Sequence, residues 1–198
     1  FGVAQIGKAF RNEITARNFV FRSREFEQME MEFFCRGEEA PRWMEYWISE
    51  RLSWYGSIGI RSGNLRLREH SKEELAHYAA GCTDIEFAFP FSPGGFGELE
   101  GIANRTDFDL RAHMARSGQN LEYIDQAGNE KLIPHVVETS GGVGRTFLAV
   151  LLDAYFEDVI EGRDRVVLRL APALAPVKIA VLPLSRKLEE GAARAASM

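Results

Sequence analysis

The sequence has 198 residues, 45% of them hydrophobic and 27% charged, which suits one globular domain or slightly more. A formal net charge of −5 excludes the broad positive field that holds nucleic acid non-specifically. No apolar run reaches the roughly 20 residues of a membrane helix, and no signal peptide precedes the first expected strand. We therefore expect a cytoplasmic protein without membrane partners, whose cysteines, Cys35 and Cys82, are structural thiols.

Two alternating stretches near the start predict a long antiparallel hairpin. The first stretch covers residues 6–14 and includes Arg11 and Glu13, and the second covers residues 26–34. In the second stretch, one face is apolar, whereas the opposite face carries Gln28, Glu30 and Glu32.

The charged face of this hairpin has two interpretations. One is the solvated outer face of an antiparallel sheet. The other is a buried polar site, because buried carboxylates such as Glu30 and Glu32 require cationic partners. Such partners would be an ammonium-bearing ligand or the arginines Arg11, Arg22, Arg24 and Arg105.

The middle of the chain predicts helices and strands in alternation. Aromatic residues at helical spacing predict a helix from Pro41 to Gly56, and a capping box at Ser71 and Glu74 predicts a shorter helix in "SKEELAHYAAG". The segments "DIEFAFPF" and "GELEGIA" read as strands around the loop "SPGGFG". A helix is expected in "RTDFDLRAHMARSG", followed by a hairpin with residues 127–129 near its tip.

Paired carboxylates recur in "GELEGIANRTDFDL", where Glu98 and Glu100 are expected to share a strand face shortly before Arg105. Carboxylates beside an arginine suit a divalent ion on phosphates or an amino acid with both its charges, and a structural ion-pair network is the alternative. The four histidines are scattered without metal-ligand spacing and are interpreted as structural. The absence of a nucleophile elbow disfavours covalent catalysis.

The segment "TSGGVGR" places glycines between a strand and the expected helix "TFLAVLLDAYFEDV", where backbone N–H groups favour an anion. It is not a P-loop, because Thr139 stands at the first glycine position and Arg145 at the lysine position. Arg145 still suits a terminal phosphate. After Gly162 we expect two strands and a short helical tail, the second strand being the continuously apolar "VKIAVLPL".

Four segments, in order, resemble the class II aminoacyl-tRNA synthetases in the form of the dimeric glycyl-tRNA synthetases. "FRNEITARNFVFRSREFEQMEMEFF" resembles the second signature motif, and "GELEGIANRTDFDL", "HVVETSGGVGRTFLAVLLDAY" and "LRLAPALAPVKIAVLPL" resemble later segments. The resemblance implies an α+β fold, an antiparallel sheet flanked by helices. The sequence departs from the family at Ala16 and Thr139, where proline is usual, and at Gly144, where bacterial members commonly have Asp.

The resemblance also implies how the chain is organised. Residues 1–170 would be the catalytic core without its first signature motif, which would precede Phe1. Residues 171–198 would be a linker and the first strand of an α/β anticodon-binding domain. We therefore expect a piece of a longer, homodimeric protein.

On the polar face of the hairpin, the resemblance implies a site for ATP, Mg²⁺ and glycine, with Arg11 and Arg145 catalytic and Glu98 near the metal. The implied ATP site comprises Arg11, Asn12, Glu13, Phe21, Arg22, Ser23, Arg24, Glu25, Phe26, Glu98, Leu99, Gly142, Val143, Gly144 and Arg145. The implied glycine site comprises Phe26, Glu27, Gln28, Met29, Glu30, Arg105, Glu138, Thr139, Ser140, Gly141 and Gly142.

The implied reaction activates glycine with ATP to glycyl-adenylate and transfers it to tRNA(Gly). Phe26 would stack on the adenine, Glu30 and Glu138 would hold the glycine ammonium, and Arg105 would lie near its carboxylate. The alternative is a truncated, non-catalytic relative that binds ATP or a partner protein. An independent nucleic-acid-binding domain is disfavoured by the acidic balance.

Overall fold

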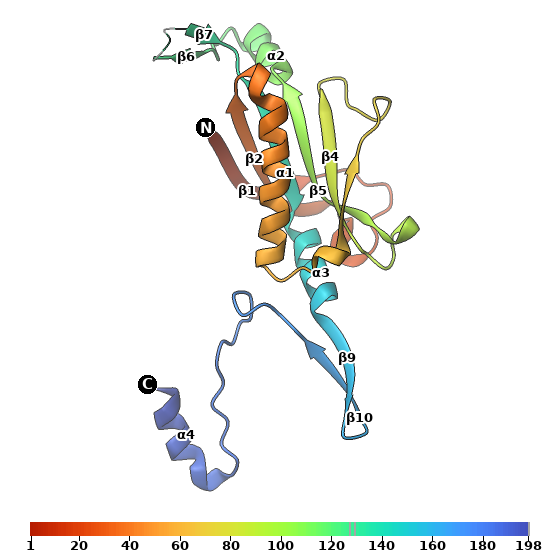
Figure 1. The fold of residues 1–198 in the computed structure, drawn as a ribbon, viewed down its shortest axis with the longest axis vertical. Coiled ribbons are helices and arrows are strands. Elements are labelled where there is room, and N and C mark those ends of the chain that lie inside the picture. Colours follow the sequence, from red (N-terminus) through yellow and green to blue (C-terminus); the bar gives the residue numbers. More distant parts are fainter. Residues whose placement is uncertain (127, 129, 198) are drawn as a thin grey trace.

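The computed structural model describes residues 1–126, 128 and 130–197. Its centre is one antiparallel sheet with strand order β1-β2-β8-β5-β4-β3 (Figure 1). These strands are β1 (Gly2–Phe10), β2 (Glu25–Cys35), β3 (Leu65–Glu69), β4 (Gly81–Phe87), β5 (Gly97–Thr106) and β8 (His135–Gly142). The sheet and its helices confirm the predicted α+β class.

The predicted hairpin exists, but its first strand begins and ends four residues earlier than expected. β1 and β2 pair from Gly2 opposite Phe33 to Phe10 opposite Glu25. Residues 11–24 form a connecting loop, in which Asn18 and Phe19 have positive φ values of 57° and 53°. Because the pairing of β1 with β2 ends at Phe10, Arg11 and Glu13 lie in the loop and not in a strand.

Helix α1 (Ala40–Ser57) covers one face of the sheet and contacts β4, β5 and β8, as Figure 1 shows. Pro41 lies in its first turn, where the missing N–H costs nothing. Between α1 and the sheet, side chains less than 2% exposed form the core: Tyr55, Ile85, Phe87, Phe89, Leu99, Ile102 and Val137. Burying each large apolar side chain contributes roughly 1.5–3 kcal/mol, so this layer fixes the sheet against α1.

The prediction of a short helix in residues 71–81 is wrong. The Ser71 N–H donates to the Glu74 carboxylate at 3.0 Å, as a capping box requires, but the segment forms only turns. Most of its residues are exposed, so little apolar burial offsets the cost of nucleating a helix. The predicted helix α2 (Phe108–Ser117) is confirmed and ends at Gly118, whose φ is 70°.

Two small hairpins flank the main sheet. The strands β6 (Tyr123–Asp125) and β7 (Glu130–Leu132) confirm the predicted hairpin, although residues 127 and 129 at its tip lie outside the described residues. Helix α3 (Val143–Ala154) follows β8 directly and ends earlier than predicted, because β9 (Tyr155–Ile160) turns back into β10 (Arg163–Leu168). This second hairpin points away from the sheet (Figure 1).

The segment after β10 differs from its prediction. Residues 177–184 form no strand in the described structure, and Ile179 and Leu184 are 85% and 96% exposed. A strand requires a hydrogen-bonding neighbour, and Figure 1 shows this segment running apart from the sheet. The predicted helical tail is α4 (Glu189–Ala196). Within the described part of the chain, no helix combines the length and apolarity that a membrane crossing needs.

Candidate active site

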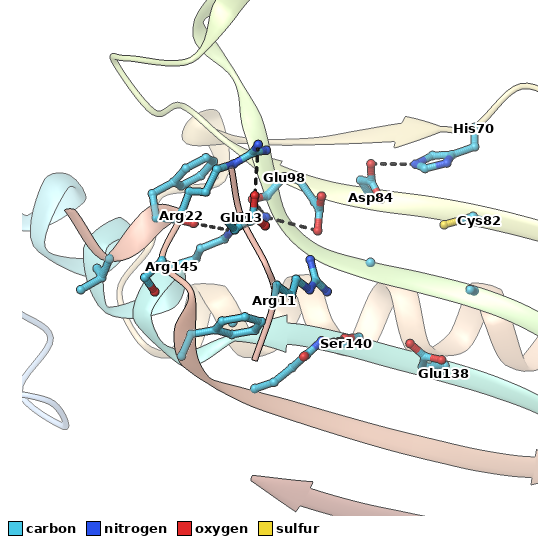
Figure 2. A pocket seen from close by; sticks show the side chains of 18 of the residues that line it. Arg11, Glu13, Arg22, His70, Cys82, Asp84, Glu98, Glu138, Ser140 and Arg145 are labelled. Atoms are coloured by element: carbon cyan, nitrogen blue, oxygen red, sulfur yellow. Dashed lines mark hydrogen bonds and ion pairs between the residues drawn. The ribbon is translucent and has the colours of Figure 1, made fainter. Parts of the chain in front are cut away.

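A cavity of about 350 Å³ opens on the sheet face opposite α1 (Figure 2). Its walls come from the loop over residues 11–24 and from β2, β4, β5, β8 and α3. The residues predicted from sequence that line it are Arg11, Glu13, Phe21, Arg22, Ser23, Phe26, Gln28, Glu98, Arg105, Glu138, Ser140, Gly142 and Arg145. Of the polar residues on the charged face of the second strand, Gln28 lines the cavity.

Arg145, in the first turn of α3, anchors one end of this cavity. Its Nε donates to the Phe21 carbonyl at 3.1 Å and its Nη1 donates to the Glu98 carbonyl at 2.9 Å. The guanidinium lies 4.5 Å from the centroid of the Phe21 ring and 3.2 Å from the Glu98 carboxylate. A fixed arginine beside a helix N-terminus is suited to a phosphate group.

The loop between β1 and β2 adds further cations to this end. The Arg11 guanidinium lies 5.3 Å from the centroid of the Phe26 ring, and the Arg22 guanidinium lies 3.7 Å from the Glu13 carboxylate. Arg24 closes the loop, because its Nε donates to the Glu13 carbonyl at 2.9 Å. Arginines beside aromatic rings suit a ligand that combines phosphates with a planar base.

The other end of the cavity is acidic. Glu138 of β8 forms an ion pair with Arg105, which also binds Asp109 at 2.8 Å. Burial raises the pKa of Glu138 even though Arg105 opposes this effect. Glu32 lies directly across from Glu138, and burial together with that carboxylate raises the pKa of Glu32 to about 7. The excess of carboxylates favours a cationic group here.

A chain of polar contacts crosses from β2 to β8 at this end. The Gln28 amide donates to the Ser140 hydroxyl at 2.6 Å, and that hydroxyl donates to the Glu30 carboxylate at 3.1 Å. The predicted arginine partners of Glu30 and Glu32 are wrong, since no ion pair of either carboxylate occurs within the described residues. Arg22 and Arg105 bind other carboxylates instead.

The expectation that Glu98 and Glu100 share a strand face is also wrong. The pairing of β4 with β5 shifts at this point: Glu86 lies opposite Glu98, whereas Ile85 lies opposite Glu100. This β-bulge at Leu99 turns Glu98 toward the cavity and leaves Glu100 buried under α1. The side chain of Leu99 is 1% exposed and belongs to the core.

The remaining predicted site residues lie outside the cavity lining. Thr139 is buried, and Glu25 forms an ion pair with Lys8 on β1. Gly144 packs close to Val20, since a Cβ there would lie 3.2 Å from that side chain. The full set outside the lining is Asn12, Arg24, Glu25, Glu27, Met29, Glu30, Leu99, Thr139, Gly141, Val143 and Gly144.

The far wall contains residues that the sequence patterns did not indicate. Tyr78 lies under Arg105, 4.3 Å from ring centroid to guanidinium, and the ring Nε2 of His70 hydrogen-bonds to Asp84 at 2.7 Å. The ligand atoms of His70, Cys82 and Asp84 lie within 4.8 Å of one another, close enough to hold a metal ion. Within the chain, Asp84 Oδ2 bonds His70 and faces Arg68 at 3.5 Å.

Residues 1–155 match the family described as "tRNA synthetase class II core domain (G, H, P, S and T)", and the chain belongs to this family. It is similar to the glycine–tRNA ligase of Caldanaerobacter subterraneus subsp. tengcongensis, with 57% identity over 192 residues, 97% of this chain and 41% of the relative. The glycine–tRNA ligase of Thermobifida fusca is 57% identical over 194 residues, 96% of this chain and 42% of the relative. The chain thus spans less than half the length of these relatives.

Two solved structures share the fold. Seryl-tRNA synthetase from Pyrococcus horikoshii, complexed with ATP, has a TM-score of 0.65 at 21% identity, covering 78% of this chain and 34% of that one. Giardia lamblia prolyl-tRNA synthetase, in complex with prolyl-adenylate, has a TM-score of 0.60 at 15% identity, covering 76% and 28%. These likenesses confirm the predicted class II fold.

Proposed function

We propose that this chain binds ATP and glycine in the cavity and joins them as glycyl-adenylate, the first step of a glycine–tRNA ligase reaction. The observation that carries the proposal is the polarity of the cavity, with Arg11, Arg22 and Arg145 at one end and Glu138 at the other. Such an arrangement complements a triphosphate and an ammonium that meet in between. The similarity to glycine–tRNA ligases supports the same assignment.

In this proposal, the cationic end orients ATP. Arg145 would bind the γ-phosphate and Arg11 the α-phosphate, while the Phe26 ring would stack on the adenine and Glu13 would contact its edge. The arginines would stabilise the charge that develops as the glycine carboxylate attacks the α-phosphorus and pyrophosphate leaves. No protein nucleophile is required, because holding the two reactants in line supplies a large part of the acceleration.

Mg²⁺ fits the donor set at this end of the cavity. The Glu98 carboxylate is 55% exposed beside Arg145, and magnesium prefers carboxylate and phosphate oxygens. Glu98 would hold the ion together with the phosphates of ATP, and the ion would neutralise part of their charge.

The acidic end would hold glycine. Glu138 and Glu30 would bind the ammonium, with Ser140 between them, and Arg105 would lie near the carboxylate. The hydrogen bonds that already link Ser140 to Gln28 and Glu30 fix this wall before the ligand arrives. Every competing amino acid is larger than glycine, so a tight wall would exclude it by overpacking, at a cost of roughly 1–3 kcal/mol.

We further propose that residues 1–170 act as the catalytic core and that residues 171–198 lead into an anticodon-binding domain. The exposed apolar side chains of residues 177–184 support this assignment, since they suit a segment that another domain covers. The complete protein would act in the cytoplasm as a homodimer on tRNA(Gly).

Glycine-dependent exchange between ATP and pyrophosphate tests the proposal directly. We expect exchange with glycine and none with alanine, and we expect Glu30→Gln to abolish it. The matched control is Glu27→Gln on the same strand, because the alternation of β2 places its side chain on the opposite face from Glu30, and it should leave exchange unchanged. ATP binding without exchange would instead support the non-catalytic alternative, and equal exchange with alanine would refute the assignment to glycine.

A further inference from the structure

The face of the sheet opposite the cavity holds a buried carboxylate that the proposed chemistry does not use. Glu100 is 1% exposed, although acidic side chains are rarely buried without a specific reason. Arg51 Nε donates to one carboxylate oxygen at 2.7 Å, and the Tyr55 hydroxyl donates to the other at 2.7 Å. Both partners belong to α1, so this cluster ties α1 to β5 by charged hydrogen bonds through the apolar core.

The position of Glu100 coincides with the β-bulge of β5. Strict alternation would put Glu98 and Glu100 on the same face, but the extra residue Leu99 sends them to opposite faces. Bulged residues lack regular ladder bonds, and the local direction of the strand depends on side-chain contacts. The bonds from Arg51 and Tyr55 join Glu100 to α1, two residues after Glu98 in the cavity wall.

The same cluster reaches the start of α3. The Tyr55 hydroxyl also interacts with the side chain of Thr146, whose own hydroxyl donates to the Gly142 carbonyl at 3.1 Å. Thr146 directly follows Arg145. The buried cluster therefore includes Glu100, two residues after Glu98, and interacts with Thr146, next to Arg145. Glu98 and Arg145 bind each other inside the cavity.

We propose that Glu100, Tyr55 and Arg51 are positioning residues that hold the β5 bulge and the first turn of α3, so that Glu98 and Arg145 meet at the phosphate end of the cavity. The consequence for ATP rests on the proposed function, whereas the positional claim concerns the chain itself. A carboxylate buried among core side chains is costly, and a well-packed apolar trio is often at least as stable. Stability alone is therefore a weak reason for this cluster.

The test uses Tyr55→Phe, which removes one hydroxyl and keeps the ring, and Glu100→Gln, which removes the charge and keeps the shape. The matched control is Asp153→Asn, because the Asp153 side chain is 4% exposed, binds Arg61 at 3.2 Å and lies at the far end of α3. Hydrogen–deuterium exchange, followed by mass spectrometry of peptides, reports local opening without any ligand. Calorimetric titration with ATP measures the affinity of the phosphate end of the cavity for ATP.

Both test variants should lose amide protection over residues 97–101 and 142–147 and keep it elsewhere in the sheet. They should weaken ATP binding by about tenfold to 100-fold. In the ATP–pyrophosphate exchange assay, they should raise the KM for ATP without changing the KM for glycine. Asp153→Asn should change neither the amide protection of these two segments nor the affinity for ATP. Uniform loss of protection over the sheet, with ATP affinity unchanged, would overturn the inference. If the unmodified chain shows no ATP–pyrophosphate exchange, the proposed function fails, and the pattern of amide protection still decides the positional claim.

Discussion

Replacing Glu32 by glutamine should stabilise the chain at about pH 8 and have little effect below about pH 4.5. Burial and the facing Glu138 carboxylate raise the pKa of Glu32 from its ordinary 4.5 to about 7 in the folded chain. Because the folded pKa lies above the unfolded one, the protonated side chain favours folding. That contribution is complete below the unfolded pKa and is lost as the pH rises through about 7.

The size of the effect follows from the two pKa values. A difference of about 2.5 corresponds to roughly 3.4 kcal/mol for a fully desolvated group, since each pKa unit is worth about 1.36 kcal/mol. Glu32 is only half-buried, so solvent screening reduces the expected gain in the free energy of unfolding to about 1–2 kcal/mol. Glutamine has the same shape and no charge, so it removes this penalty without opening a cavity.

Urea denaturation at about pH 4, 6 and 8 measures the free energy of unfolding of both proteins. The control is Glu45→Gln, on the exposed face of α1, which should shift stability by less than about 0.5 kcal/mol at each pH. A Glu32→Gln variant with the same stability gain at every pH would refute the reasoning, because the effect would then not arise from a titrating carboxylate. A loss of stability at about pH 8 would show that the charged form makes a favourable contact.

Two further substitutions test the packing around the site. Phe89→Ala should lower the free energy of unfolding by about 3–5 kcal/mol, because the buried ring packs edge-on against Phe21 at 4.9 Å, and urea titration would measure the loss. Gly59→Ala should lower it by about 1–2 kcal/mol, since φ is +96° and the new Cβ would lie 2.9 Å from Ala171. Its control, Gly56→Ala within α1, has open space and should raise the melting temperature. Equal effects of the two glycine changes would contradict this account.

Sequence patterns correctly predicted the helices and strands whose formation depends mainly on their own residues. The alternation of β2 and the aromatic spacing of α1 were recognisable, because a two-residue period and a 3.6-residue period each place the apolar side chains on one face. The predictions failed where contacts with another segment of the chain decide whether a helix or a strand forms. Residues 71–81 carry a helix-start signal but bury too little to form a helix, and residues 177–184 look like a strand but have no strand beside them in the described structure.

The sequence by itself determined the family and the kinds of side chain at the candidate site, because the arginines, carboxylates and glycines occur in recognisable motifs. Only the tertiary structure decided which of them share the cavity. The bulge at Leu99 separates Glu98 from Glu100, and the pairing of β3 with β4 brings His70 beside Asp84. Register and bulges are set by hydrogen bonds between strands distant in the chain, so the direction of each side chain does not follow from spacing alone.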